Sequence, residues 1–263
     1  MQRRDLAAID RSTFTNPYVL GGAAVAFALL ARWWWGESEE RATERVVDES
    51  SDPIVPNVQQ SFSYLTTTNF TPSLAKAFIA SLPTLGQQYG QFMVDAGREF
   101  GVSPFLLAGI MEQETGYGAC VGGRGSGPSC IGFNGQDRGL MQINDGYFPE
   151  FFAAVTADGT PYWADPKQNV RQGAKILASN MDYWRGKGGT DASDPRPLTD
   201  ARKIAWYALA SYNAGAGAVL KWVKRGQSPD RATYDRKYGE TVLQRAKRIA
   251  TATSIKAGGT GNV

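Results

Sequence analysis

The chain has 263 residues, of which 42% are hydrophobic and 20% charged, so it can form a packed core and is not expected to be disordered. It contains two cysteines and no histidine, which excludes Ser-His-Asp and Cys-His catalysis and histidine-ligated zinc sites. The formal net charge of +3 is too small to indicate nucleic-acid binding. An enzyme of this composition would move protons with carboxylates, lysines, tyrosines or thiols.

The N-terminal part contains an uncharged stretch of twenty residues, 12–31, followed by tryptophans at 33–35. Such a stretch is about long enough for a helix to cross the hydrocarbon core, and tryptophan favours the membrane interface. Arginines precede the stretch and glutamates follow it, which would place the rest of the chain outside the cytoplasm. We therefore expect a membrane anchor over residues 12–35. A cleaved signal peptide, with Ala26 and Ala28 before the cut, is the alternative.

Composition divides the chain into four predicted segments. Residues 1–35 would be the cytoplasmic-side segment and the transmembrane helix, and residues 36–61, which are charged and then contain prolines, are typical of a linker. Residues 62–255 show helical periodicity and are expected to form one domain. Residues 256–263 would be a flexible tail.

Helical signals dominate the predicted domain. Apolar residues recur at helical spacing from Leu85 to Phe100, and the glycine that follows is typical of a helix end. Ser103-Pro104 and Asp165-Pro166 each combine an N-cap residue with a proline in the first turn. The predicted helices span 104–116, 165–186, 200–211, 216–224 and 239–251, and strand-like alternation is confined to 120–133. The predicted fold is mainly α.

Glu114 is the candidate catalytic residue on the helix predicted over 104–116. The positions three, four and seven residues before it, which share its helix face, hold Met111, Ile110 and Leu107, whereas Glu112 points to the polar side. A carboxylate at the end of an apolar stripe is partly desolvated, which raises its pKa and suits a general acid. A glutamate that reaches solvent or an ion pair at the helix end is the alternative interpretation.

Two later motifs place amide or hydroxyl side chains beside glycines. They are Gly-Leu-Met-Gln at 139–142, directly followed by Ile143 and Asn144, and Tyr-Asn-Ala-Gly at 212–215. Glycine lets the backbone approach a ligand closely, and amides and hydroxyls suit the polar groups of a sugar. Each motif alone is as easily a capped turn or part of the core.

Together, the residues 110–116, 139–142 and 212–215, in this order, resemble the soluble lytic transglycosylase and goose-type lysozyme superfamily, glycoside hydrolase family 23. The stretch 238–246 is similar to the final helix of goose-type lysozymes. The resemblance covers roughly residues 89–250. It implies a lysozyme-like fold with a cleft for the glycan strands of peptidoglycan, and no metal or cofactor.

The resemblance also implies roles for individual residues. Glu114 falls on the family's catalytic acid, and Tyr238 on the tyrosine that helps to orient it. The expected substrate-binding residues around them, of which Tyr147 has less support, are Met141, Gln142, Asn144, Tyr147, Tyr212 and Asn213.

Two reactions fit such a site. A goose-type muramidase would hydrolyse the β-1,4 bond with help from a second carboxylate. Goose-type lysozymes carry an aspartate where this chain has Asn144, and the nearby Asp137 and Asp145 are out of register. A lytic transglycosylase uses one glutamate as acid and then base, forms a 1,6-anhydro product and needs no second carboxylate. We therefore expect a transglycosylase, with hydrolysis assisted by Asp137 or Asp145 as the alternative.

Another class of function is a non-catalytic, glycan-binding component of an envelope or virion, against which the intact Glu114 argues. Cys120 and Cys130 are expected to form a disulfide because an extracytoplasmic domain is in an oxidising compartment, and two buried thiols are the alternative. Residues 221–256 are locally basic and most simply form a solvated face, with a weaker role in attracting an anionic polymer. The expected partners are peptidoglycan and, through residues 12–35, a bacterial or phage-associated lipid bilayer, but no nucleic acid.

Overall fold

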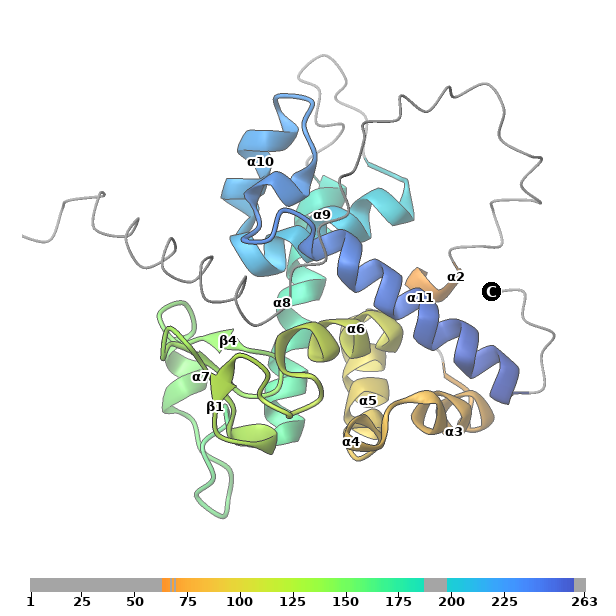
Figure 1. Ribbon diagram of the computed structural model, residues 1–263, viewed down its shortest axis with the longest axis vertical. Helices are drawn as coiled ribbons and strands as arrows, with labels where there is room; N and C mark the ends of the chain where they lie inside the picture. Colours follow the sequence, from red (N-terminus) through yellow and green to blue (C-terminus); the bar gives the residue numbers. More distant parts are fainter. Residues whose placement is uncertain (1–62, 67, 69, 187–197, 258–263) are drawn as a thin grey trace, which may run out of the picture. The chain divides into compact units, whose positions relative to one another are not determined.

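Helices and one short sheet make up the described part of the chain, which comprises residues 63–66, 68, 70–186 and 198–257 of a computed structural model (Figure 1). The helices preceding the sheet are α2 (Ser63–Thr66), α3 (Pro72–Ser81), α4 (Thr84–Gln87), α5 (Gly90–Phe100) and α6 (Pro104–Thr115). Those following it are α7 (Pro149–Ala153), α8 (Pro166–Gly186), α9 (Ala201–Ala214), α10 (Ala216–Val223), the 3-10 helix η4 (Pro229–Ala232) and α11 (Tyr238–Lys256). The prediction of a mainly α domain is confirmed.

Capping residues set the helix boundaries that the sequence predicted. The Ser103 hydroxyl accepts a hydrogen bond from the Phe105 amide at the start of α6, and Asp200 accepts one from the Lys203 amide at the start of α9. Gly101 and Gly116 end α5 and α6 in the left-handed conformation, with φ of 66° and 59°. The predicted apolar stripe from Leu85 to Phe100 is instead divided between α4 and α5.

Helix α6 lies at the centre of the domain, where it contacts α2, α5, α8 and α11 (Figure 1). All residues from Pro104 to Met111 are buried, so the helix has no solvent-facing stripe over this length. A Cβ on Gly109 would lie 2.9 Å from the Val242 carbonyl oxygen, which shows how closely α6 and α11 approach. The central position of α6 brings its last turn, with Glu114, against the start of α11.

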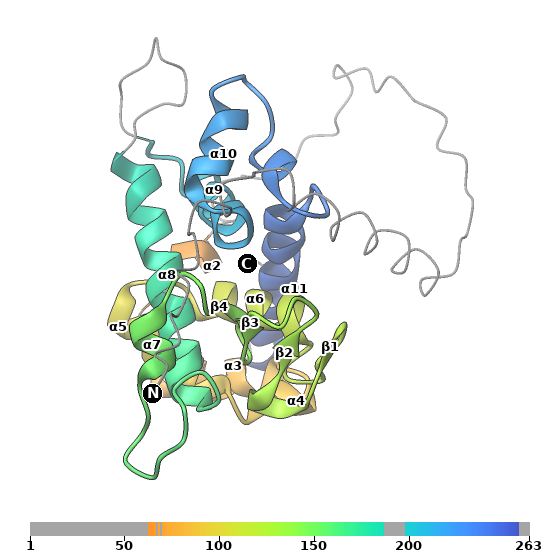
Figure 2. The same ribbon diagram turned by 90° about the vertical axis from the view of Figure 1, so that its left-hand side faces the viewer.

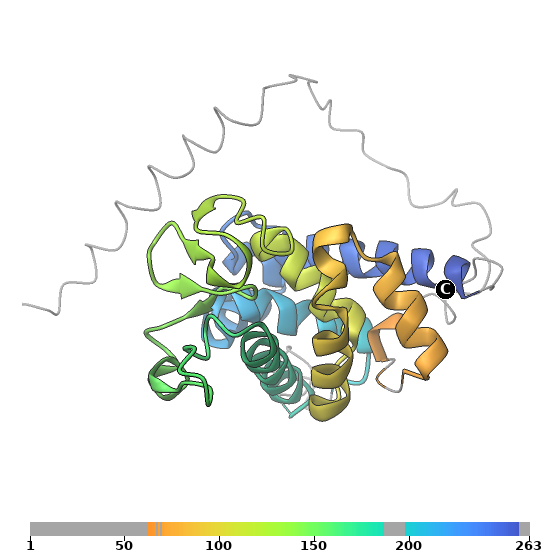
Figure 3. The same ribbon diagram turned by 90° about the horizontal axis from the view of Figure 1, so that it is seen from below.

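On another side of the domain, α8 packs between α5 and α9 (Figure 3). Its apolar stripe is buried as predicted, from Val170 through Leu177 to Trp184. The indole of Trp184 donates a hydrogen bond to the Ser211 hydroxyl over 2.9 Å. This contact ties the end of α8 to the turn of α9 that precedes Tyr212.

A four-stranded antiparallel meander lies between α6 and α7, with the strands side by side in the order β1-β2-β3-β4 (Figure 2). They are β1 (Gly123–Arg124), β2 (Ile131–Gly132), β3 (Asp137–Arg138) and β4 (Ile143–Asn144), with the 3-10 helix η3 (Gly127–Ser129) between β1 and β2. The predicted disulfide between Cys120 and Cys130 is formed, with Cα atoms 5.5 Å apart, and closes the loop that contains β1. The strand signal at 120–133 is confirmed, and the sheet extends further along the chain than predicted.

The predicted fold class also included a transmembrane helix, and this part is wrong for the described residues. None of the helices that the structure describes combines the length and hydrophobicity needed to cross a bilayer. They are either short or, like α8 and α11, carry many polar and charged residues. The stretch 12–35, on which that prediction rested, lies outside the described residues, as do the predicted linker and most of the predicted tail.

Candidate active site

Glu114 is half-buried in the last turn of α6, where the Tyr238 hydroxyl donates a hydrogen bond to its Oε1 atom. Burial raises the pKa of the Glu114 carboxyl from its ordinary value of 4.5 to about 7. The hydrogen bond from Tyr238 opposes this rise, whereas the negative charges of Asp137 and Asp235 add to it. Glu114 therefore holds a proton at near-neutral pH, as the apolar stripe in the sequence predicted.

Tyr238 is the first residue of α11, and the buried carboxylate of Asp230 fixes this end of the helix. Asp230 accepts hydrogen bonds from the Gly239 amide over 2.7 Å and from the Glu240 amide over 3.1 Å. It also accepts one from the indole of Trp206 on α9 over 2.7 Å. Asp230 thus caps the first turn of α11, which positions the Tyr238 hydroxyl against Glu114. Asp230 lies eight positions before Tyr238 and outside all the motifs from which the site was predicted, so it was not among the predicted residues.

The turn between β3 and β4 contains the Gly-Leu-Met-Gln motif and is held by three side chains from different helices. Buried Asn169 of α8 accepts a hydrogen bond from the Met141 amide over 2.8 Å and donates to two backbone carbonyls. Thr115 of α6 donates to the Leu140 carbonyl over 2.9 Å. Tyr212 of α9 donates to the Met141 carbonyl over 2.9 Å.

These contacts define the positions of three predicted site residues. The Met141 side chain is fully buried, and its backbone carbonyl accepts the hydrogen bond from Tyr212. Burial, with the nearby charge of Glu114, raises the pKa of Tyr212 well above its ordinary value, so its hydroxyl stays protonated. Gln142 has a left-handed backbone, with φ of 45°, and its side-chain amide donates to the Gly139 carbonyl over 2.8 Å.

The two candidate second carboxylates have different surroundings. Asp145 forms an ion pair with Arg138, in which their side-chain atoms are 2.9 Å apart. Asp137 pairs with Asn144 across β3 and β4 and accepts a hydrogen bond from its side-chain amide over 2.8 Å. Asn134 donates to the other carboxylate oxygen of Asp137 over 2.6 Å. Because the charge of Asp137 raises the pKa values of Glu114 and Tyr212, its carboxylate lies within electrostatic reach of both.

The remaining predicted sugar-binding residues lie at the surface. Asn213 is exposed, and its side-chain oxygen accepts a hydrogen bond from the Tyr234 amide over 3.3 Å. Tyr147 is 79% exposed and lines a hollow formed with α7 and α8, to which Glu114 does not contribute. Asn213 therefore lies beside Tyr212 and contacts the segment that precedes Tyr238. Tyr147 lies at a hollow that Glu114 does not line.

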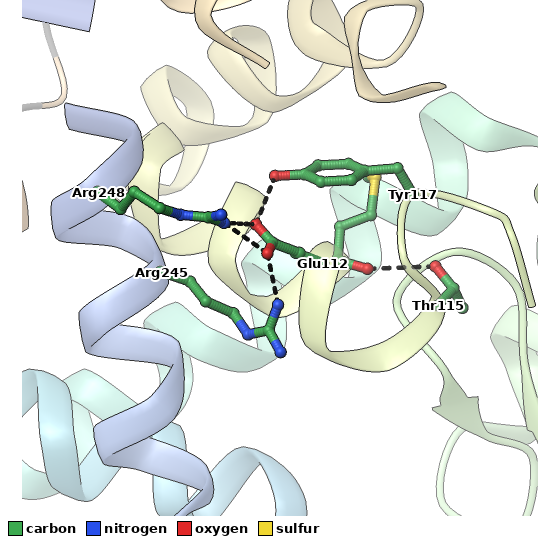
Figure 4. Close-up of polar contacts among 6 residues, drawn as sticks. Glu112, Thr115, Tyr117, Arg245 and Arg248 are labelled. Atoms are coloured by element: carbon green, nitrogen blue, oxygen red, sulfur yellow. Dashed lines mark hydrogen bonds and ion pairs between the residues drawn. The ribbon is translucent and has the colours of Figure 1, made fainter. Parts of the chain in front are cut away.

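Glu112, which the helical spacing placed on the polar side, is instead held in a network between α6 and α11 (Figure 4). Its carboxylate forms ion pairs with Arg245 and Arg248, and the Tyr117 hydroxyl donates to it over 3.3 Å. The Glu112 side chain is 14% exposed. The network links the two helices that carry Glu114 and Tyr238. Because its arginines are more than 130 positions away along the chain, helical periodicity could not reveal it.

Among the described residues, no group of three or more Asp, Glu or Cys side chains is arranged to hold a metal ion. The groups gathered at the site are one protonated carboxyl, Glu114, two protonated phenols, Tyr212 and Tyr238, and one further carboxylate, Asp137. Such an arrangement can donate a proton to a bound oxygen atom and then accept one.

The chain is similar in sequence to known proteins. Residues 92–234 match the family described as "Transglycosylase SLT domain". The chain is 29% identical over 140 residues to "Membrane-bound lytic murein transglycosylase C" of Actinobacillus pleuropneumoniae serotype 5b (strain L20), a match that covers 51% of this chain and 33% of the relative. It is 26% identical over 153 residues to the protein of the same name from Actinobacillus succinogenes, covering 56% of this chain and 36% of the relative. The chain therefore spans about a third of the length of these relatives.

Proposed function

The chain belongs to the transglycosylase SLT family, and we propose that it cleaves peptidoglycan glycan strands as a lytic transglycosylase with Glu114 as acid and then base. The observation that carries the proposal is the half-buried Glu114 carboxyl, whose pKa of about 7 lets a large fraction of it stay protonated at neutral pH beside the hydroxyl donor Tyr238. The bond cut would be the β-1,4 linkage between N-acetylmuramic acid and N-acetylglucosamine.

In the first step, the Glu114 carboxyl donates its proton to the oxygen of the glycosidic bond. The bond between that oxygen and the anomeric carbon breaks, and positive charge develops on the sugar ring. Tyr238 stabilises the carboxylate that remains, because its hydroxyl donates to Oε1 of Glu114. Asp137 contributes a negative charge near the developing positive charge.

In the second step, ionised Glu114 accepts the proton of the C6 hydroxyl of the same muramic acid. The C6 oxygen forms a bond to the anomeric carbon and closes a 1,6-anhydro ring. The proton gained by Glu114 restores the starting state, so neither water nor a second basic group is consumed. Asn144, which occupies the position of an aspartate in goose-type lysozymes, supports this one-carboxylate reaction.

Hydrolysis is the second candidate, and one observation favours it. Asp137 is close enough to Glu114 for its charge to raise the Glu114 pKa, so it could direct a water molecule toward the anomeric carbon. Against this, its two oxygens already accept hydrogen bonds from Asn134 and Asn144. Both carboxylate oxygens are therefore already engaged, which leaves fewer lone pairs free to bind and orient a water molecule.

The products distinguish the two reactions. We expect mass spectrometry of digested peptidoglycan to show muropeptides that end in anhydro-muramic acid, which are one water lighter than hydrolysed ones. Asp137→Asn should release the same anhydro products, although more slowly. Reducing-end products from the wild type that disappear in Asp137→Asn would instead establish hydrolysis.

The pH dependence of cleavage should report the Glu114 pKa. Because the first step needs the protonated carboxyl, kcat/KM should fall as the pH rises above about 7. Asp137→Asn removes a charge that raises this pKa, so the alkaline limb of the profile of kcat/KM against pH should move to lower pH. Tyr238→Phe removes a hydrogen bond that lowers the pKa, so its limb should move to higher pH. Shifts in the same direction would contradict these electrostatic roles.

The disulfide between Cys120 and Cys130 supports a location outside the cytoplasm. Reducing compartments keep thiols free, whereas the periplasm and other extracytoplasmic spaces let disulfides persist. The proposed substrate, peptidoglycan, is found in the same spaces. Both features therefore indicate an extracytoplasmic enzyme.

A further inference from the structure

The segment 221–237, which joins the end of α10 to the start of α11, carries a concentration of exposed positive charge. It contains six lysines and arginines and two aspartates. All six cationic side chains are exposed: Lys221, Lys224, Arg225, Arg231, Arg236 and Lys237. We call this set the basic segment.

The charge of the basic segment is not neutralised by acidic neighbours. The ion pairs among the described residues involve arginines elsewhere, namely Arg98, Arg138, Arg171, Arg185, Arg245 and Arg248. Of the two aspartates in the segment, Asp230 is buried and accepts the hydrogen bonds that cap α11. Asp235 is exposed and is the only acidic side chain at the surface of the segment.

The basic segment borders the candidate active site. The charge of Asp235 raises the pKa of Glu114, so this part of the segment lies within electrostatic reach of the catalytic carboxyl. The Tyr234 amide donates to Asn213, and the segment ends at the residue before Tyr238. Because Tyr238 donates its hydrogen bond to Glu114, a polymer bound at Glu114 lies beside the end of this segment.

Arg236 occupies a backbone conformation that favours glycine or asparagine. Its φ is 58°, in the left-handed region, and its amide donates to the Thr233 carbonyl to close the turn. The Arg236 side chain is exposed, and asparagine adopts this backbone conformation more readily than arginine does. Arg236→Asn should therefore leave stability unchanged or higher, which separates a binding role from a structural one.

We propose that the basic segment binds the carboxylates of the stem peptides on the glycan strand that occupies the active site, an inference that rests on the proposed function. Stem peptides project from every muramic acid and carry free carboxylates at their ends and on acidic residues. Exposed cations that form no ion pair with the acidic side chains of the described residues are suited to bind them. The position beside Glu114 favours this polymer over an anionic lipid surface, which would have no reason to meet the catalytic carboxyl.

Binding to immobilised peptidoglycan strands tests the proposal, with the stem peptides left in place or removed by an amidase. The lactyl carboxylate that this cleavage exposes on each muramic acid is then converted to an amide. All proteins carry Glu114→Gln so that strands stay intact. Replacing Lys224, Arg231 and Arg236 with Gln, Gln and Asn should weaken binding to peptide-bearing strands about tenfold at low salt. The matched control replaces the exposed Lys76, Lys167 and Lys203 with Gln, removing equal charge elsewhere. It should weaken binding less than about twofold.

The loss should vanish on strands without peptides and shrink at high salt, with thermal unfolding unchanged. Equal losses in both triple variants would show a net-charge effect and overturn the proposal. A loss of binding that persists on peptide-free strands would also overturn it. So would a loss that is absent on strands and seen only when the same proteins are tested on vesicles that contain anionic lipid. If the Glu114→Gln protein still cuts the strands, the proposed function fails, and this is visible as release of strand fragments rather than as weaker binding.

Discussion

Replacing Glu114 with glutamine is expected to lower the rate of peptidoglycan cleavage by about 10²- to 10⁴-fold, the contribution of a positioned general acid and base. Glutamine keeps the size of the side chain and can still accept the hydrogen bond from Tyr238, but it carries no transferable proton at neutral pH. Turbidity loss of sacculi, followed by product analysis, measures the effect. Glu150→Gln, a change at an exposed glutamate in α7, is the matched control and should retain full activity.

The same variant should be more stable than the wild type at alkaline pH. The pKa of Glu114 is raised on folding, from 4.5 to about 7, so the folded protein binds its proton more tightly than the unfolded chain. Its contribution to stability is therefore fully present below pH 4.5 and is lost as the pH rises through about 7. Glutamine has no such loss, and its advantage at pH 8 should be about 1–3 kcal/mol.

Chemical denaturation of both proteins at pH 5 and pH 8 measures this difference. If the inactive variant is more stable than the wild type at pH 8, its activity is lost because it has no transferable proton and not because it unfolds. If Glu114→Gln cleaves as fast as Glu150→Gln, the assignment of Glu114 is wrong. If stability depends on pH in the same way in both proteins, the raised pKa is wrong.

Gly139→Ala is expected to destabilise the domain by about 3 kcal/mol or more and to abolish activity. A Cβ at this position would lie 2.1 Å from the Asn169 side-chain nitrogen and 2.4 Å from the Trp163 carbonyl oxygen. The backbone φ of 79° adds strain for any residue other than glycine. The change would displace Asn169, which binds the Met141 amide, and so distort the turn that Tyr212 contacts.

Gly159→Ala provides the control for backbone strain alone. Gly159 has a similar φ of 85°, but a Cβ there would meet nothing within 4 Å. This variant should lose only about 1–2 kcal/mol and keep its activity. The free energies of unfolding from denaturant titration, compared between the two variants, isolate the contribution of the steric conflict. Equal losses would mean that close packing at Gly139 does not hold the motif.

The sequence predicted those parts of the fold that depend on neighbouring residues. Ser103, Gly101 and Gly116 act within one turn of their helices, so their roles can be read from local spacing. Glu114 could also be predicted, because the apolar residues that desolvate it lie on the same helix. The capping and periodic signals therefore predicted α6, α8 and the half-buried Glu114 carboxyl, whose catalytic role is our proposal.

Other parts of the site depend on contacts between distant segments and could not be predicted in this way. Asn169 binds a turn 28 positions earlier, and Glu112 meets arginines of α11. Helical periodicity shows that Glu112 lies on the polar face of α6, but it does not show that α11 covers this face. The strands β3 and β4, of two residues each, are too short for a visible alternation. Whether the assigned sugar-binding residues contact substrate stays a prediction.

The hydrogen bond between Tyr238 and Glu114 joins residues that are 124 positions apart. During synthesis on the ribosome, α6 emerges long before Tyr238, so the nascent chain contains Glu114 without its hydrogen-bond donor. A chain that is truncated between these residues would have most of the family's sequence motifs and yet no assembled site. On the proposed mechanism, cleavage therefore becomes possible only after α11 has packed against α6, which delays activity until synthesis of the domain is almost complete.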